Sequence, residues 1–330
     1  AVLASLFLFV SIVYNNFIQK SIYEENSQHL LSTYEQVDKT FTMFVQHNWN
    51  ALSDWSNNLQ YLDDAENMKT LWYEFARRKD AWQYQDFYMF NENCDFITAA
   101  GRDGNAPNIQ GIFLDMYKTG QPVISSYIAS DSNRRIVFAL PMDVPYTING
   151  ITYSGLAVSY NNDVVEKLIA GNIYQGQSDC YILTSDGNVL LSLEPKTEFL
   201  QHISNLFDFL NKYTDMTETE ITDLKKNIKN VSTGSLQCRY NKKNYYLVYE
   251  PTGINDWTIV GIIHNDVVDA SMRRIQFITI VLLLILNGCI ALLLTGTVFA
   301  LMDSRLRMKE HEQMILLKRK ELTEQMFSGL

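Results

Sequence analysis

Residues Asp86–Thr98 read DFYMFNENCDFIT, and residues Asp179–Leu191 read DCYILTSDGNVLL. Each stretch is an alternating apolar run, then a polar turn, then a second short apolar run. Alternation with a period of two is typical of a half-buried strand, and SDGN at 185–188 is a strong hairpin-turn sequence. The two stretches therefore predict the same strand, turn and strand twice in the chain, as the halves of an internal repeat.

A second pair of similar segments lies later in each half of the repeat. The hydrophobic runs Gly155–Tyr160 and Thr258–Ile263 each follow a β-rich stretch that contains a proline, and each leads into the letters NDVV, at 162–165 and 265–268. Asn and Asp are good N-cap residues, because their side chains accept hydrogen bonds from the first free N–H groups of a helix. The repeat therefore predicts two tandem α+β modules, at about 85–170 and 177–270.

The residues before the repeat predict one long helix, at 15–64. The first glycine of the chain is Gly101 and the first proline is Pro107. Mostly apolar residues recur at close to 3.5-residue spacing, which is the period of a helix packed along another surface: Leu30, Tyr34, Val37, Phe41, Phe44, Asn48, Ala51, Trp55, Leu59 and Leu62. Such a helix reaches roughly 70 Å. The stripe packs on the chain's own sheets, forms a dimer seam, or does both.

Both ends of the chain are apolar. Phe277–Met302 contains no charged residue, and at ~1.5 Å per residue it is long enough to cross the roughly 30 Å hydrocarbon core of a bilayer. Residues 1–14 are equally apolar but too few to span, so they predict either a signal-peptide core or a truncated first membrane helix. The second reading is favoured, because no small-x-small cleavage pattern follows.

The charge distribution bounds the partners and the orientation. The chain has 27 basic and 37 acidic side chains and a formal net charge of −10, which argues against nucleic acid as a partner. Basic residues just past Met302 place the C-terminus in the cytoplasm by the positive-inside rule and residues 15–276 outside, although Arg273 and Arg274 weaken that assignment. The four cysteines have no metal-ligand spacing, and pairing of Cys180 with Cys238 stays open.

A long outward helix, two sheet modules and a return helix into the membrane, with the motifs DFYMFNE, SDGNVLL and the doubled NDVV, resemble a double Cache sensor domain. The resemblance covers residues 15–276. It implies a PAS-like fold for each module and an extracytoplasmic input domain whose membrane-distal module holds a small molecule. The expected fold is α+β, with two tandem PAS-like modules on a long N-terminal helix, bracketed by two transmembrane helices. The expected division is a first membrane helix at 1–14, the outward helix at 15–64, a distal module at 65–170, a proximal module at 171–276, a second membrane helix at 277–302 and a cytoplasmic signalling helix at 303–330.

The predicted ligand site lies in the distal module. The amino-acid-binding branch of the family carries Arg-x-Trp-Tyr near the end of its long helix, whereas this chain has TLWY at 70–73 and lacks the arginine that clamps a carboxylate. An aromatic set with one arginine and one aspartate suits a small zwitterion, carboxylate or amine, and successive strand residues face opposite ways, so at most one of Arg134 and Arg135 points inward. The residues predicted to line the site are Trp82, Tyr84, Tyr88, Tyr127, Arg134, Asp143, Tyr146 and Tyr153.

No catalytic motif, cofactor motif or metal-ligand cluster is present in the sequence, so we expect no catalytic residue, cofactor or metal. Beyond the membrane run, Leu301, Met308, Ile315 and Leu322 recur every seven residues, which predicts a weak coiled coil and hence a homodimer. The favoured function is the ligand-sensing and signalling region of a bacterial membrane receptor, in contact with lipid and small molecule but not nucleic acid. Its output is a histidine kinase or a diguanylate cyclase. The alternatives are a surface adhesion protein without signalling output and an outer-region enzyme.

Overall fold

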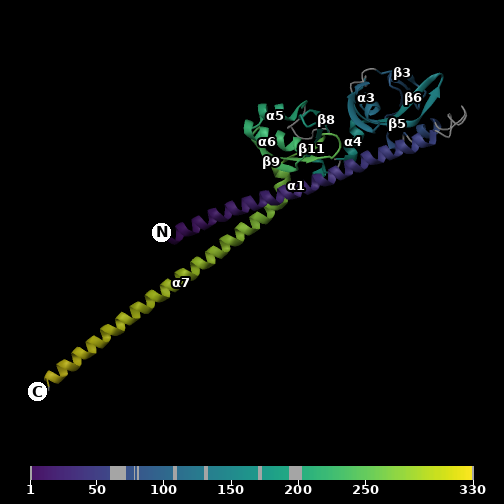
Figure 1. Cartoon of the computed structure of the whole chain (residues 1–330). Coiled ribbons are helices and arrows are strands. Elements are labelled where there is room, and N and C mark those ends of the chain that lie inside the picture. The colour runs from purple at the N-terminus through teal and green to yellow at the C-terminus, as the bar shows by residue number, and fades with distance from the viewer. Residues whose placement is uncertain are drawn as a thin grey trace. The chain divides into compact units, whose positions relative to one another are not determined.

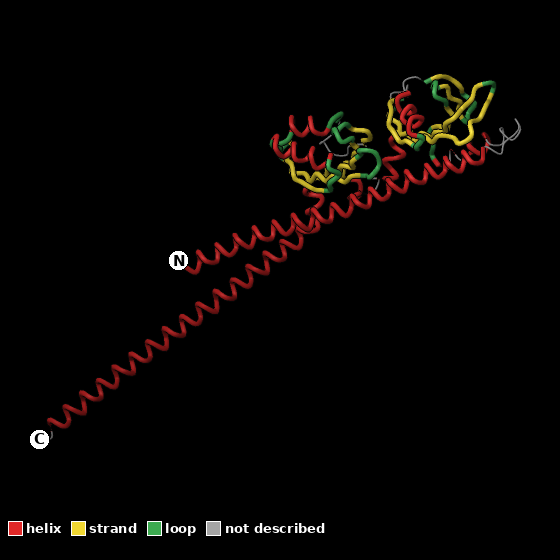
Figure 2. The backbone as a smooth tube through the Cα atoms, viewed as in Figure 1, coloured by secondary structure: helices red, strands yellow, loops and turns green. Residues whose placement is uncertain are grey.

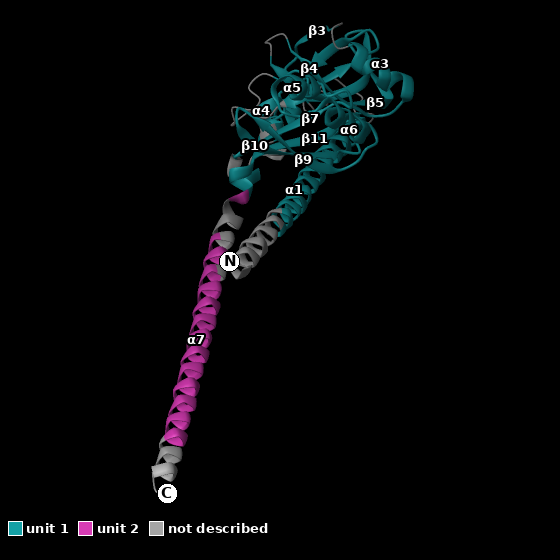
Figure 3. Ribbon diagram, turned by 90° about the vertical axis from the view of Figure 1, so that its left-hand side faces the viewer, with its two compact units in different colours: residues 1–268 teal, residues 269–330 magenta. Residues whose placement is uncertain are grey.

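A computed structural model of the protein describes residues 2–59, 72–77, 79, 82–106, 110–129, 133–169, 173–192 and 203–328. The chain divides into two units, Ala1–Val268 and Asp269–Leu330, coloured teal and magenta in Figure 3. The first unit contains the N-terminal helix and both sheets, and the second contains most of the C-terminal helix.

Helix α1, Val2–Leu59, is one continuous helix (Figure 2). Its predicted apolar stripe is buried at Leu30, Tyr34, Val37 and Phe41, and the buried line then passes through Val45 and Leu52 to Leu59. Phe44 and Ala51 lie at the margin, because an α-helix has 3.6 residues per turn and drifts from a 3.5-residue repeat. The buried stripe belongs to one apolar cluster shared with strands of both sheets, which confirms packing on the chain's own sheets. Leu62 lies outside the described residues, and the dimer seam stays a prediction.

The distal sheet has six antiparallel strands in the order β3-β2-β1-β6-β5-β4 (Figure 1). The predicted hairpin at Asp86–Thr98 is confirmed as β1 and β2, and the β5–β6 hairpin has a register shift between Pro141 and Tyr146. Helix α3, Gln110–Thr119, covers one face of the sheet, and α1 covers the other. The strands are β1 Asp86–Phe90, β2 Asp95–Thr98, β3 Asp103–Asn105, β4 Val123–Ile128, β5 Arg134–Ile148 and β6 Ile151–Asn161.

The proximal sheet has five antiparallel strands in the order β8-β7-β11-β10-β9. It confirms the second strand-turn-strand prediction, and Gly187 in the turn has a φ of +84°, which favours glycine. Helices α5, Leu206–Tyr213, and α6, Glu218–Lys229, cover the face turned away from α1. The strands are β7 Ser178–Leu183, β8 Val189–Ser192, β9 Gly234–Tyr240, β10 Lys243–Pro251 and β11 Thr258–His264.

Both NDVV segments begin helices, as predicted. Helix α4, Asn162–Ile169, follows β6, with the short 3₁₀ helix η2, Ile173–Gly176, after it, and α7, Asn265–Ser328, follows β11. The capping prediction is wrong for α7: His264 Nδ1 accepts from the Asp266 amide at 3.0 Å. Within the described residues, the side-chain oxygen of Asn265 has no hydrogen-bond partner. The N-cap is therefore one residue earlier than the sequence suggests.

The two faces of the proximal sheet also settle the cysteine question. Cys180 belongs to the cluster on the α1 side and Cys238 to the cluster under α5 and α6, and both are free thiols. On the α1 side, a Cβ added to Gly261 of β11 would collide with the ring of Tyr34. Helix α1 therefore lies close to the backbone of this strand, and Gly261 is the residue that permits the approach.

Among the described residues, helix α7 contains one stretch, Phe277–Lys320, that could cross a membrane by its length and composition. Its most apolar 18-residue window has a mean hydropathy of 2.8, and none of that window is buried in the protein. Apolar residues such as Phe277 and Leu292 expose 69% and 74% of their surface, as expected of a helix whose apolar side chains contact lipid or another protein surface. Residues 2–14 belong to α1, but their side chains lie outside the described residues. The α+β class, the two modules and the long helix are confirmed, whereas bracketing by two membrane helices stays a prediction.

Candidate functional site

Strand alternation divides the residues of the distal sheet between two environments. In β1, Phe87 and Met89 belong to the cluster on the α1 side. Tyr88 and Phe90 belong to the cluster under α3, and Asp86 has the same parity. We call the side of the distal sheet that carries Asp86, Tyr88 and Phe90 the α3 face. It is the face of the distal module that α1 does not occupy.

The strand register places polar residues at one end of the α3 face. Asp86 lies opposite Ser159 of β6, and Arg135 of β5 lies between Tyr127 of β4 and Asn161 of β6. One row further along β1, Tyr88 lies opposite Ala157. Six positions on neighbouring strands thus bring a carboxylate, a guanidinium, an amide and three hydroxyl groups together, although they are up to 75 residues apart in sequence.

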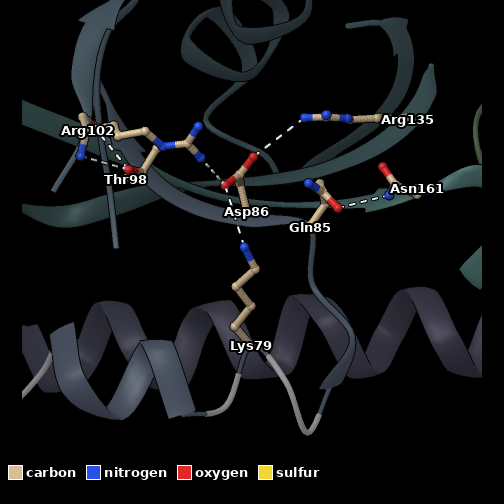
Figure 4. Close-up of polar contacts among 7 residues, drawn as sticks. All are labelled: Lys79, Gln85, Asp86, Thr98, Arg102, Arg135 and Asn161. Atoms are coloured by element: carbon tan, nitrogen blue, oxygen red, sulfur yellow. Dashed lines mark hydrogen bonds and ion pairs between the residues drawn. The ribbon is translucent and has the colours of Figure 1, made fainter. Parts of the chain in front are cut away.

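Asp86 is surrounded by three cationic side chains: Arg135 of β5, Arg102 of the turn between β2 and β3, and Lys79, which precedes β1 (Figure 4). Its Oδ1 lies 2.8 Å from Arg102 Nη2 and 4.0 Å from Lys79 Nζ, and its Oδ2 lies 3.5 Å from Arg135 Nη1. The side chains of Asp86 and Arg135 expose 16% and 13% of their surface, against 66% for Arg102. The pair Asp86–Arg135 is therefore the desolvated centre, and the three cations leave an excess of positive charge beside it.

Two hydroxyl groups next to this pair are buried. Burial raises the pKa of Tyr88 well above its usual value, and the neighbouring Tyr127 and Asp86 raise it further, so the phenol stays neutral. Ser159 is fully buried. Among the described residues, neither Ser159 Oγ nor the Tyr88 oxygen has a well-formed hydrogen bond. Buried polar groups are normally paired, so the Ser159 hydroxyl is available to a further hydrogen-bonding group, whereas the Tyr88 hydroxyl already interacts with Tyr127.

The other end of the α3 face is apolar. The rings of Phe90 and Phe113 stack at 3.8 Å between centroids, and Met116 of α3 packs in the same cluster. Between this stack and the polar end, the sheet presents the small side chains of Ala139 and Ala157, with Val137 and Tyr88 beside them. The face therefore combines a polar end, a stretch of small residues and an apolar wall, which is the composition of small-molecule sites.

On the α3 face, the structure brings together two of the eight predicted site residues, Tyr88 and Tyr127. Tyr84 and Trp82 lie on the α1 side. The ring of Trp82 stacks on that of His47 of α1 with 4.3 Å between centroids, and the rings of Tyr84 and Tyr160 are in edge contact with 5.2 Å between centroids.

The remaining four predicted residues also lie off the α3 face. Tyr146 and Tyr153 are paired across the β5–β6 hairpin and pack with the α1-side cluster. Asp143 is exposed on the same hairpin. Arg134 Nη1 donates to the carbonyls of Val189 and Leu190 in the proximal sheet, at 2.8 and 3.1 Å. The eight residues do not line a single site in this structure.

Sequence reasoning missed Asp86, Arg135 and Ser159. The signal for Asp86 was present, because it opens the quoted strand and Tyr88, two residues on, shares its face. Arg135 was weighed as one of an adjacent pair, but the residues that follow it, Ile136–Ala139, are apolar at every position, so alternation did not select it. Within the described ranges, no three His, Cys, Asp or Glu side chains converge in a way that could hold a metal ion.

Several solved structures share this fold, at low sequence identity. The sensory domain of the Campylobacter jejuni chemoreceptor Tlp3, solved with isoleucine bound, aligns with a TM-score of 0.51 at 10% identity, over 77% of this chain and 98% of that one. The ligand-binding domain of the Pseudomonas aeruginosa PAO1 amino acid chemoreceptor PctB, in complex with L-Arg, gives 0.52 at 13% identity, over 74% and 97%.

The extracellular domain of the histidine kinase candidate mmHK1S-Z3 gives a TM-score of 0.51 at 13% identity, over 73% of this chain and 98% of that one. No protein-family model and no curated protein matches the sequence. These neighbours are sensory domains of the kind that the double Cache resemblance predicts, so the likeness confirms the double Cache fold of the two modules.

Proposed function

We propose, from the double Cache fold, that this chain is the sensory and membrane-crossing region of a bacterial receptor. Residues 15–276 lie outside the cytoplasm, the chain crosses the membrane at 1–14 and 277–302, and two copies associate. A small molecule binds at the α3 face of the distal module, and α7 carries the signal to a cytoplasmic output of histidine kinase or diguanylate cyclase type.

The observation that carries this proposal is the convergence of Asp86, Arg135, Tyr88 and Ser159 at one end of the α3 face. The guanidinium, with Arg102 and Lys79 nearby, supplies positive charge for a carboxylate. Asp86 and the two hydroxyls supply acceptors for an ammonium group. The chemoreceptor domains of similar fold were solved with isoleucine and L-Arg, which are both zwitterions. A small carboxylate or amino acid is therefore the ligand class that fits best.

A thermal-shift screen of the full chain in detergent against amino acids, carboxylates, amines, purines and sugars tests the proposal. A ligand present at about 100 times its Kd stabilises the folded state by about 2.7 kcal/mol. We expect Arg135→Lys and Asp86→Asn to remove the shift, because both alter the desolvated pair.

Asp143→Asn is the matched control, since Asp143 is an exposed carboxylate on the same β5–β6 hairpin. A thermal shift that survives Arg135→Lys but is lost with Asp143→Asn would place the ligand site on the β5–β6 hairpin near Asp143 instead of on the α3 face. No shift with any compound class would argue against a small-molecule sensor.

A further inference from the structure

The two modules of the first unit exchange hydrogen bonds at the edges of their sheets. Strand β4 is an edge of the distal sheet, and β8 is an edge of the proximal sheet. Arg134 of the distal module donates to the Val189 and Leu190 carbonyls of β8. Asn255 of the proximal module donates through Nδ2 to the Ile124 carbonyl of β4, at 3.1 Å. Each module therefore caps carbonyl groups on an edge strand of the other.

The local backbone on the proximal side is shaped for this exchange. A register shift lies between Ile182 and Leu183 where β8 pairs with β7, and such irregularities turn successive carbonyls out of the ladder. One arginine nitrogen can then reach two neighbouring carbonyls. Asn255 has a φ of +50°, a conformation that asparagine tolerates better than most residues.

The turn that carries Asn255 is itself fixed to the rest of the proximal module. The carboxylate of Asp256 accepts from the Ser185 hydroxyl at 2.6 Å and from the Ser185 amide at 3.1 Å. Ser185 lies in the turn between β7 and β8. The β10–β11 turn and the β7–β8 turn are therefore joined; the first carries Asn255, and the second leads into β8.

The position of Arg134 connects this junction to the candidate site. Arg134 and Arg135 are successive residues of β5, so their side chains leave the strand on opposite sides. Arg135 lies on the α3 face against Asp86, while Arg134 holds β8. Any shift of this part of β5 must move both guanidinium groups, because one strand carries them.

We propose that Arg134 and Asn255 form a reciprocal edge link, which passes displacement of β5 at the α3 face to strand β8 of the proximal module. The link is a positioning device, since neither residue touches the proposed ligand. Its role in ligand response rests on the proposed function, but its mechanical part does not.

Hydrogen exchange measured by mass spectrometry on the full chain in detergent, without ligand, tests the link. Arg134→Ala removes a charged donor to β8, and we expect the amides of Val189–Leu191 to exchange about tenfold faster. Arg134→Lys, which keeps the charge but loses the planar fork, should have a smaller effect. Asn255→Ala should speed exchange in β4.

Arg239→Ala is the matched control, because Arg239 is a proximal-module arginine whose Nε lies 3.4 Å from Asp215. It should leave β8 unchanged. Unchanged β8 exchange in Arg134→Ala, or an equal change in Arg239→Ala, would overturn the link.

A double-substitution cycle tests the transmission itself. Arg135→Ala disturbs the site end of β5 and should change β8 exchange when Arg134 is present, but not in the Arg134→Ala background. The same change in both backgrounds would refute transmission through Arg134. Because no ligand is used, this result is independent of the thermal-shift screen, so the proposed function and the link can fail separately.

Discussion

The two sheets begin with the same pattern and build different surfaces on it. Strand β1 starts Asp86-Phe87-Tyr88, and in β7 the first residue, Ser178, is followed by Asp179-Cys180-Tyr181. In both strands, alternation places the aspartate and the tyrosine on the face of the sheet that is turned away from α1. Asp86 lies opposite the small Ser159, whereas Asp179 lies opposite Ile262. The neighbouring strand decides whether the repeated pattern becomes a polar face or an apolar core.

The covering helices continue this difference. In the proximal module, α5 and α6 place Phe207, Leu210 and Leu224 over Ile262 and Leu247, and all five side chains are buried. Among the described residues of the distal module, α3 covers the apolar end of the face, and small residues and charges lie along the rest beside Val137. A repeat can therefore keep one fold while its two copies build different surfaces on it.

The largest expected effect comes from removing side-chain volume at equivalent positions of the two faces. Ile262→Ala should destabilise the chain by about 2–5 kcal/mol, because Ile262 is fully buried in a packed cluster. Ser159→Ala at the matching distal position should change the free energy of unfolding by less than ~1 kcal/mol, since it removes a buried hydroxyl. Denaturant unfolding followed by tryptophan fluorescence measures both. Equal losses would mean that both faces are packed cores.

A second, smaller contrast concerns how α1 holds each sheet. On the distal sheet, the buried Tyr160 hydroxyl donates to Asn48 Oδ1 of α1 at 2.8 Å. On the proximal sheet, Tyr34 of α1 fits over Gly261 by shape, and within the described residues its hydroxyl has no well-formed hydrogen bond. The first contact is polar and paired, and the second depends on close packing.

Removing each hydroxyl tests this contrast. Tyr160→Phe should cost about 1–2 kcal/mol, because it leaves the Asn48 oxygen buried and unpaired. Tyr34→Phe should change the free energy of unfolding by less than ~0.5 kcal/mol, since the ring is kept. The same unfolding assay measures both, and a larger loss for Tyr34→Phe would reverse the assignment of the two contacts.

The sequence predicted those parts of the fold that rest on a local period. The stripe of α1, the two hairpins and the two helices at NDVV all follow from spacing within one segment. The site depends instead on which side of a strand a residue takes. Arg134 and Arg135 precede Ile136–Ala139, which is apolar at every position, so alternation gave no face for either arginine. The partner strands β6 and β4 supply that information, and they are distant in sequence.

The smallest expected effect concerns charge. The α3 face gathers cations around one carboxylate, whereas the contact between α1 and β10 carries the carboxylates of Asp38 and Glu250. Burial raises the pKa of both groups, and the charges of Asp38 and Glu35 raise that of Glu250 further, while Thr42, Thr233 and Lys39 act in the opposite direction. Among the described residues, Asp38 Oδ1 and Glu250 Oε2 are buried without a hydrogen bond. The contact between α1 and β10 is therefore destabilised at neutral pH, because the charged forms of these two carboxyl groups are unfavourable there.

The sign of the pH dependence follows from these raised values. Between its usual pKa of 4.5 and the higher pKa of the folded protein, Glu250 holds more protons folded than unfolded, so stability rises as pH falls through that window and levels off below it. Glu250→Gln should raise the unfolding midpoint at pH 7 and flatten its rise toward pH 5. Asp256→Asn is the opposite control, because hydrogen bonds from Ser185 lower the pKa of the Asp256 carboxyl. The substitution should destabilise the protein at pH 7. This loss of stability should shrink as pH falls below the usual pKa of 3.8. Thermal unfolding scans across pH measure both. If the unfolding midpoint of Glu250→Gln varied with pH in parallel to that of the unmodified chain, the carboxylate of Glu250 would not destabilise the contact between α1 and β10. The electrostatic contrast between this contact and the α3 face would then be lost.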